Sequence, residues 1–176
     1  MDANVSSPFT GMAGKRLSAT ACNILRGSPL VVIGHYSGTR GGCDTIRAVD
    51  GGLAEAVRSA AAFTSSGCNV ILEGLELSSD TDHTLPLSQK HPLHVLQLST
   101  PASHCVRNLV RRRRPRRDMA AGIETAVATD LERIDEACRV LSRHANVKKV
   151  SLDKAQAEAE TLLGLSKAAS PNELQI

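Results

Sequence analysis

A carboxylate at the end of a short apolar run is the first candidate for chemistry in this sequence. The run 70–72 (Val-Ile-Leu) lies between Gly67 and Gly74 and is followed by Glu73. Its length and flanking glycines favour a strand buried on both faces, although a buried helix segment would show a similar pattern. Because ligands of open α/β sheets bind beyond the carboxyl ends of strands, we expect Glu73 at the mouth of a site. The alternative is a strand-end glutamate that only faces solvent.

A cluster of arginines is the second candidate, and its chemistry would be phosphate binding. Within a short segment the sequence contains Arg107, Arg111, Arg112, Arg113, Arg114, Arg116 and Arg117, with Pro115 interrupting them. Guanidinium groups bind phosphate oxygens through paired hydrogen bonds. A solvated basic face is the alternative, but like charges at this density repel one another unless an anion compensates them. The cluster therefore favours an anionic partner.

A glycine-rich segment after the expected strand 30–33 is the third candidate. Between Gly34 and Thr45 it contains further glycines at 38, 41 and 42, with polar side chains from His35, Tyr36, Arg40 and Asp44. Glycines let a backbone approach a ligand closely, and the polar side chains could hold that ligand. A flexible connection would not need this mixture of residues. We therefore expect these four polar residues to contact a ligand.

The segment 9–18 (FTGMAGKRLS) partly matches a phosphate-binding loop, G-x-x-x-x-G-K-[ST]. Gly14 and Lys15 are in place, but Phe9 replaces the first glycine and Arg16 replaces the hydroxyl residue that binds Mg²⁺. No apolar strand precedes the segment, and the motif is informative only between a strand and a helix. On its own, a chance Gly-Lys pair at a helix start explains the segment better.

The elements that would position these residues alternate along the chain. We expect strands at 30–33, 70–72, 94–98 and 147–152, helices at 15–26, 52–65, from Pro101 with Thr100 as its cap, 123–141 and 153–163, and an irregular loop at 78–92. The last helix is expected to be capped by Asp153. Alternation of this kind predicts an α/β fold with a mainly parallel sheet flanked by helices. We expect a flexible N-terminus at 1–8, a single domain at 9–165 and a flexible tail at 166–176.

The amino-acid composition excludes several classes of protein and kinds of site. The chain has 176 residues, 41% of them apolar, a net charge of +3, two phenylalanines, one tyrosine and no tryptophan. This poverty of aromatic residues argues against nucleic-acid readers that stack bases on aromatic side chains. Five widely spaced cysteines form no CxxC pair, so neither a disulfide framework nor a zinc site is indicated. With no signal-like or membrane-spanning segment, we expect a cytoplasmic protein without a membrane partner.

Three stretches together resemble small P-loop kinases of bacteriophages, here with a degenerate P-loop. They are 33–36 (Ile-Gly-His-Tyr), 41–46 (Gly-Gly-Cys-Asp-Thr-Ile) and 70–75 (Val-Ile-Leu-Glu-Gly-Leu). The later segments 98–113 and 150–153 are similar to the strand, arginine-bearing lid helix and last strand of that family. The family includes nucleoside and nucleotide kinases and 5-hydroxymethyluracil DNA kinases. The resemblance implies a three-layer P-loop kinase-like fold, with an arginine-rich lid at 107–117.

The resemblance also implies a reaction, in which a phosphoryl group passes from ATP, with Mg²⁺, to a hydroxyl of a nucleotide or modified DNA base. Its catalytic residues would be Glu73, Lys15, Arg107 and Arg111, with Glu73 accepting the hydroxyl proton or holding Mg²⁺ through water. The cofactor would bind to Gly11, Gly14, Lys15, Ser18 and Arg112. The acceptor would face His35, Tyr36, Arg40 and Asp44, and no dedicated metal ligands are expected.

Two other functions remain open from the sequence. The chain could be a catalytically degenerate P-loop-fold protein that binds nucleic acid or nucleotide through its arginine cluster. It could also be a kinase of free mononucleotides, which differs from a DNA kinase only in the size of the acceptor. Residue 16 bears on the first possibility, because an arginine cannot ligate Mg²⁺, although Ser18 could substitute for the missing hydroxyl. The sequence does not fix the oligomeric state.

Overall fold

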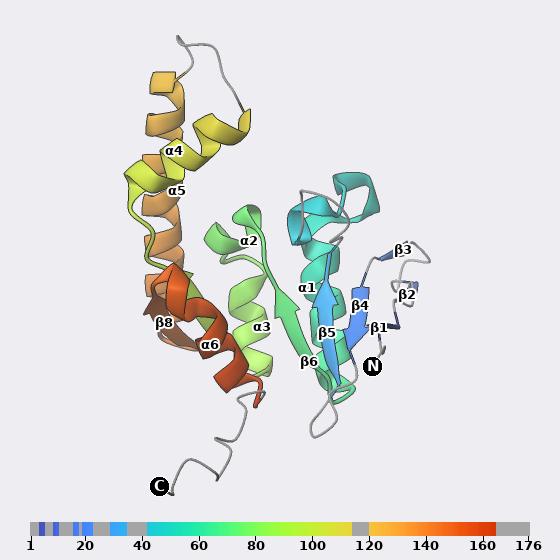
Figure 1. Ribbon diagram of the computed structural model, residues 1–176. Helices are drawn as coiled ribbons and strands as arrows, with labels where there is room; N and C mark the ends of the chain where they lie inside the picture. The colour runs from blue at the N-terminus through green and yellow to red at the C-terminus, as the bar shows by residue number, and fades with distance from the viewer. Residues whose placement is uncertain are drawn as a thin grey trace, which may run out of the picture.

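The chain folds into a mixed α/β structure with short parallel strands flanked by helices, as the sequence predicts (Figure 1). The structure is a computed structural model that describes residues 4–5, 9–10, 16–17, 19–22, 29–34, 42–113 and 120–164. The expected flexible tail and most of the expected flexible N-terminus lie outside these residues. The exception is Asn4–Val5, which forms strand β1.

Within the described residues, the strands form one larger and two smaller sheets. The four-stranded sheet has the order β1, β4 (Ala19–Cys22), β5 (Leu30–Ile33) and β6 (Asn69–Leu72). Strands β5 and β6 are parallel, with Leu30 opposite Asn69 and Ile33 opposite Leu72, whereas β4 runs antiparallel to both β1 and β5. The small sheets are the antiparallel pair β2 (Phe9–Thr10) and β3 (Arg16–Leu17) and the parallel pair β7 (His94–Leu98) and β8 (Asn146–Val150).

This arrangement corrects the prediction of one mainly parallel sheet in which strand 70–72 is buried on both faces. Within the described part of the chain, β6 is the last strand of its sheet, and β4 pairs antiparallel with both of its neighbours. The side chains of Val70, Ile71 and Leu72 are consequently half-buried instead of fully buried. An apolar run shows that a strand is buried in part, but the run does not reveal how many neighbours the strand has.

The best-buried part of the core lies between β5 and helix α1 (Gly52–Ser65). Val31 and Ile33 are 2% and 0% exposed, and they pack in one cluster with Ala56 and Ala60 of the helix. The small alanine side chains let the helix approach the strand closely, which suits a chain so poor in aromatic residues. Burying a side chain of the size of Ile33 stabilises the fold by roughly 1.5–3 kcal/mol. The predicted strand 30–33 and helix 52–65 are both confirmed.

The chain between β6 and β7 is helical, which corrects the predicted irregular loop at 78–92. Helix α2 spans Leu75–Ser79 and helix α3 spans Thr84–Lys90. The carboxylate of Asp80 accepts hydrogen bonds from the backbone N–H groups of His83 and Thr84, both at 3.1 Å, and so caps α3. Pro86 lies in the first turn of α3, where a missing N–H costs no intrahelical hydrogen bond. Proline there is a helix-start signal, not a sign of irregular backbone.

The prediction of a helix at 15–26 is wrong where the structure describes these residues. Arg16–Leu17 and Ala19–Cys22 are strands, and Ala19–Cys22 pairs with all four residues of β5. A β-strand edge such as that of β5 offers unpaired N–H and C=O groups. Pairing with it outweighs a helix propensity that amounts to a few tenths of a kcal/mol per residue.

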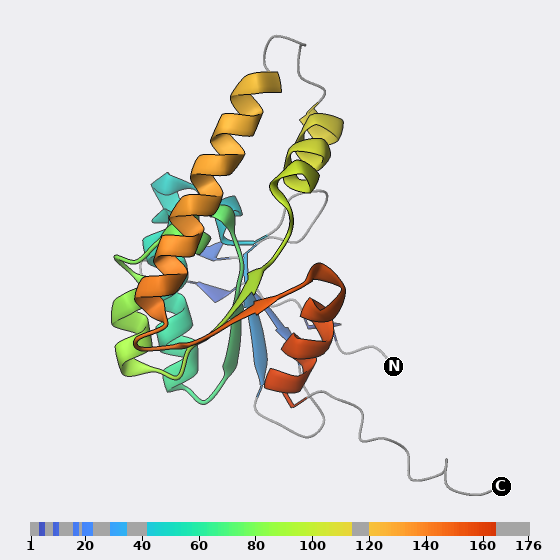
Figure 2. The same cartoon turned by 90° about the vertical axis from the view of Figure 1, so that its left-hand side faces the viewer.

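The described part of the chain contains three further α-helices, α4 (Ala102–Arg113), α5 (Ala120–Leu141) and α6 (Leu152–Leu162). The N-cap of α6 is Ser151, which precedes the predicted cap, Asp153, in the chain. Figure 2 shows α4 and α5 side by side, extending beyond the strands. Asp135 ties α5 to the β7–β8 sheet, because its carboxylate accepts hydrogen bonds from Gln97 (2.5 Å) and Lys149 (3.4 Å). No helix in the described ranges is long and apolar enough to cross a membrane.

Candidate active site

The carboxyl ends of β5 and β6 lie at the same edge of the sheet, because the two strands are parallel. In Figure 1 both arrowheads point toward the end of the molecule from which α4 and α5 extend. Strand β5 continues into Gly34, and β6 continues into Glu73 and Gly74. The structure places Glu73 at the end of a strand, as predicted. Ligands of open α/β sheets bind at this edge.

The Gly-Cys-Asp segment that follows β5 is fastened to the end of β6. The backbone N–H of Cys43 donates a hydrogen bond to the carbonyl oxygen of Glu73 at 2.6 Å. Gly42 adopts φ +82° and ψ −170°, a conformation open almost only to glycine. A Cβ atom at Gly42 would lie 2.5 Å from the same Glu73 oxygen. We call this junction of residues 42–44 with residues 73–74 the Gly42–Glu73 latch.

Asp44 completes the latch by capping helix α2. Its carboxylate oxygens accept hydrogen bonds from the backbone N–H groups of Leu75 (2.7 Å) and Glu76 (3.3 Å). A Cβ atom at Gly74 would lie 2.5 Å from one of these oxygens, so the close approach needs glycine there. Asp44 therefore fixes the backbone next to Glu73. Its predicted contact with an acceptor stays a prediction.

Cys43 lies inside the latch with its thiol buried at 2% residue exposure. Burial, with the nearby negative charges of Asp44 and Glu73, raises the pKa of this thiol from 9.0 to about 11. The neutral thiol is thus the form that the folded chain favours. Such a thiol is a poor nucleophile at neutral pH, which fits packing better than catalysis.

The Cys43 thiol should make the protein less stable at alkaline pH. Between pH 9 and pH 11 the unfolded chain loses this proton while the folded chain keeps it, so the free energy of unfolding falls as pH rises. Urea unfolding at about pH 8 and about pH 10 measures the fall, which should be smaller in Cys43→Ala than in wild type. Cys68→Ala, which removes a half-buried thiol, is the control. Equal falls in wild type and Cys43→Ala would contradict the assignment.

The side chains expected to act on phosphate are exposed and unpaired. Glu73 faces solvent, as do Arg107, Arg111 and Arg112 on α4. None of the four side chains makes an ion pair or hydrogen bond with another residue that the structure describes. All four are free to meet a ligand. No hydrogen bond or ion pair joins Glu73 to these arginines within the described ranges.

The other predicted site residues lie outside the described part of the chain. They are Gly11, Gly14, Lys15, Ser18, His35, Tyr36 and Arg40. Their roles remain predictions. Near the Gly-Lys pair the structure describes Phe9–Thr10 and Arg16–Leu17, which form the antiparallel strands β2 and β3 and not a strand and a helix.

A pocket that the sequence did not predict lies beside the strand end, between α2 and α5. It encloses about 210 Å³ and is lined by Leu75, Glu76, Ser79, Asp130, Arg133 and Ile134. One signal in the sequence could have found it. Asp130 stands three residues after Val127 and four before Ile134, so helical spacing places a carboxylate on the apolar face of α5.

No cluster of three or more His, Cys, Asp or Glu side chains that could hold a metal ion occurs within the described ranges. Mg²⁺ in phosphoryl-transfer sites is bound mostly by substrate phosphates and water, with one or two carboxylates. Glu73 is an exposed carboxylate at the candidate site and could be one such ligand. The exposed arginines of α4 fit the phosphates of a nucleotide.

Comparison with known proteins shows a similarity over part of the chain. The chain is 37% identical over 86 residues to a 5-hmdU DNA kinase of Pseudomonas phage PaMx11. The aligned stretch covers 48% of this chain and 43% of the relative, so the chain matches less than half of the relative's length. No protein-family model matches the sequence, and no solved structure matches the chain. The comparison supports a kinase-like relationship over part of the chain.

Proposed function

We propose that the chain is a phosphotransferase that moves a phosphoryl group from ATP to a hydroxyl of a nucleotide or of a modified DNA base, as a 5-hydroxymethyluracil DNA kinase does. The observation that carries the proposal is the 37% identity with a phage 5-hmdU DNA kinase. The free carboxylate of Glu73 at the end of a parallel strand is consistent with it, because phosphoryl transfer needs a group there that can take up a proton.

In the proposed reaction the acceptor hydroxyl oxygen bonds to the γ-phosphorus of ATP. The bond from that phosphorus to the bridging oxygen breaks, which releases ADP, and the hydroxyl proton passes to the carboxylate of Glu73. Arg107, Arg111 and Arg112 donate hydrogen bonds to phosphate oxygens and stabilise their charge. Mg²⁺ bound to the nucleotide would neutralise further charge on the phosphates.

The test is transfer of label from γ-labelled ATP with Mg²⁺. DNA that contains 5-hydroxymethyluracil and the corresponding mononucleotide are offered separately, with DNA that contains thymine as the control. We expect the label on hydroxymethyluracil and none on thymine, which lacks the hydroxyl. If no offered hydroxyl becomes labelled, the proposed activity is wrong. The ratio of label on DNA to label on mononucleotide decides which acceptor is used.

A second candidate function is binding of nucleic acid or nucleotide without catalysis. The observation that favours it is the pairing of β2 with β3 on either side of Gly14 and Lys15. A working phosphate loop joins a strand to a helix, whose N-terminus helps hold the phosphates. If this function is the right one, the chain binds DNA and transfers no label in the same assay.

Both candidate functions predict that the arginines of α4 bind phosphate. Replacing Arg111 and Arg112 with alanine should weaken DNA binding and reduce the slope of log K against log[salt] by roughly one for each phosphate that is no longer neutralised. Fluorescence anisotropy with labelled DNA at several salt concentrations measures the slope. Arg139→Ala is the control, because Arg139 is already paired with Glu136. An unchanged slope in the double variant would mean that these arginines do not bind DNA phosphates.

A further inference from the structure

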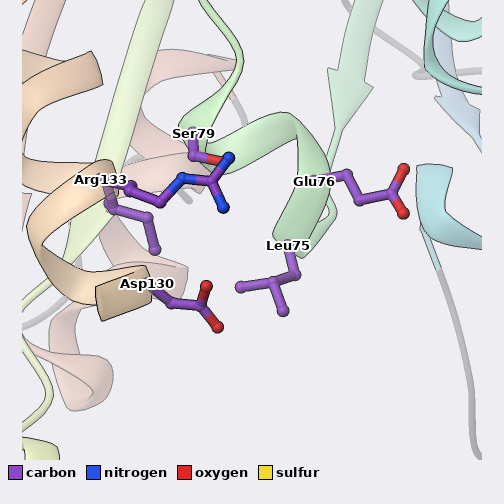
Figure 3. A pocket seen from close by; sticks show the side chains of 6 residues that line it. Leu75, Glu76, Ser79, Asp130 and Arg133 are labelled. Carbon is purple, nitrogen blue, oxygen red and sulfur yellow. The ribbon is translucent and has the colours of Figure 1, made fainter. Parts of the chain in front are cut away.

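The pocket between α2 and α5 combines charged side chains of both signs, Glu76, Asp130 and Arg133, with an apolar floor. Figure 3 shows Leu75 and Asp130 pointing toward one another, while Arg133 reaches toward Ser79 and Glu76 points away from Asp130. Leu75 is 55% exposed, so a large apolar side chain faces the open space. Ile134 adds a second apolar side chain from α5. The pocket thus offers an apolar surface against which a flat ring can pack.

The charges in this pocket have no partner of their own. Asp130 is half-buried, and neither its carboxylate nor the guanidinium of Arg133 forms a hydrogen bond or ion pair with any residue in the described ranges. Other charged side chains on the same helix do pair, as Arg139 does with Glu136. A half-buried carboxylate without a hydrogen-bond donor is disfavoured, so the site is suited to a ligand that supplies one.

We propose that this pocket binds the pyrimidine base of the acceptor. A pyrimidine carries a ring or amino N–H next to a ring carbonyl or nitrogen. Asp130 would accept the hydrogen bond from that N–H, Arg133 would donate to the neighbouring acceptor atom, and Leu75 and Ile134 would pack against the ring. About 210 Å³ is small for a ligand site, which typically has roughly 300–1,000 Å³, and suits a single ring better than a purine.

The pocket is also close enough to Glu73 to serve the reaction. Leu75 follows Glu73 by two positions, and two residues span at most about 7 Å. The Gly42–Glu73 latch and the Asp44 cap hold this stretch in place. A hydroxyl carried on the bound base could therefore reach the carboxylate of Glu73. In this respect the inference rests on the proposed phosphotransferase function, although binding of the base does not require turnover.

Binding and turnover are measured separately to test the pocket. Isothermal titration calorimetry without ATP uses 5-hydroxymethyl-2′-deoxyuridine as the pyrimidine probe and 2′-deoxyguanosine as the purine probe. We expect wild type to bind the pyrimidine more tightly. Asp130→Asn and Arg133→Gln should each raise its Kd roughly ten- to hundredfold, as expected when a charged hydrogen bond is removed. Glu132→Gln, an exposed carboxylate on the same helix, is the matched control and should bind as wild type does.

The possible results distinguish the pocket assignment from the proposed function. One possible result is that wild type binds the pyrimidine, that the two variants no longer bind it and that no phosphate is transferred. The pocket assignment is then supported and the kinase function fails. If wild type is an active kinase and both variants keep its KM for the acceptor, the pocket assignment is overturned and the kinase function stands. Absence of pyrimidine binding by wild type, or tighter binding of the purine, also overturns the pocket assignment. Circular dichroism spectra of the variants exclude misfolding as the cause of weaker binding.

Discussion

Replacing Glu73 by glutamine is expected to lower phosphoryl transfer by roughly two to four orders of magnitude, the usual contribution of a positioned acid–base group. Glutamine keeps the size of the side chain but cannot take up the acceptor's proton. The side chain of Glu73 is exposed and makes no hydrogen bond within the described structure, so its replacement should leave the fold unchanged. Only the backbone carbonyl of residue 73 takes part in the latch, and glutamine retains it.

Two measurements make the Glu73 result specific. The turnover rate should fall in Glu73→Gln, while the affinity for DNA and the midpoint of thermal unfolding should stay at wild-type values. Asp82→Asn, which removes another exposed carboxylate that has no partner in the described structure, should keep full activity. Turnover of Glu73→Gln within a few-fold of wild type would show that this carboxylate is not the proton acceptor.

The local elements were predictable where the sequence pattern is strong. The strand Leu30–Ile33, the helix Gly52–Ser65 and the amphipathic helix that ends at Leu141 all lie where periodicity places them. Their apolar residues repeat with the spacing of the element that they form, and packing then supports that choice. The short helices α2 and α3 were missed because such short segments show no clear period. The start of α3 is set by a side-chain cap from Asp80, which the sequence alone marks only weakly.

Sheet order depends on long-range pairing and could not be predicted from the same patterns. The strand Asn69–Leu72 has the composition of a central strand and yet is the last strand of the described four-stranded sheet. The segment Ala19–Cys22 has the composition of a helix and forms a strand, because β5 offers it an edge. In both cases the pairing of the strand with another strand decides the structure. Local propensity carries little information about that pairing.

The candidate site likewise contains residues that could be predicted from the sequence and residues that could not. Glu73 could be predicted because a strand end is visible in the sequence, and the structure places it at one. Of the pocket between α2 and α5 the sequence marks only Asp130, by its helical spacing, because the pocket's residues come from two helices far apart in the sequence. The sequence also suggested a substrate role for Asp44, and the structure shows its carboxylate bound to the backbone of α2. A polar residue in a glycine-rich segment can serve the backbone as readily as a ligand.

The Gly42–Glu73 latch should be very sensitive to a single methyl group. In Gly42→Ala the added Cβ would lie 2.5 Å from the carbonyl oxygen of Glu73, a backbone atom that cannot rotate away. The residue would also be held at φ +82°, which costs a non-glycine residue roughly 1–3 kcal/mol. Strain and clash together should lower the free energy of unfolding by about 3 kcal/mol or more, a large part of the roughly 5–15 kcal/mol available to a typical domain.

Gly67→Ala is the matched control, because Gly67 has nearly the same backbone angle, φ +84°, and a Cβ there would meet no atom within 4 Å. The free energy of unfolding of Gly67→Ala should fall only by the conformational cost of the left-handed region, roughly 1–2 kcal/mol. Urea unfolding of both variants measures the difference, which reports the clash with Glu73 together with the extra strain of the extended ψ angle at Gly42. The turnover rate of Gly42→Ala should also fall, because the backbone that carries Glu73 must move to relieve the clash. Equal stabilities of the two variants would mean that residues 42 and 73 do not meet as closely as the latch requires.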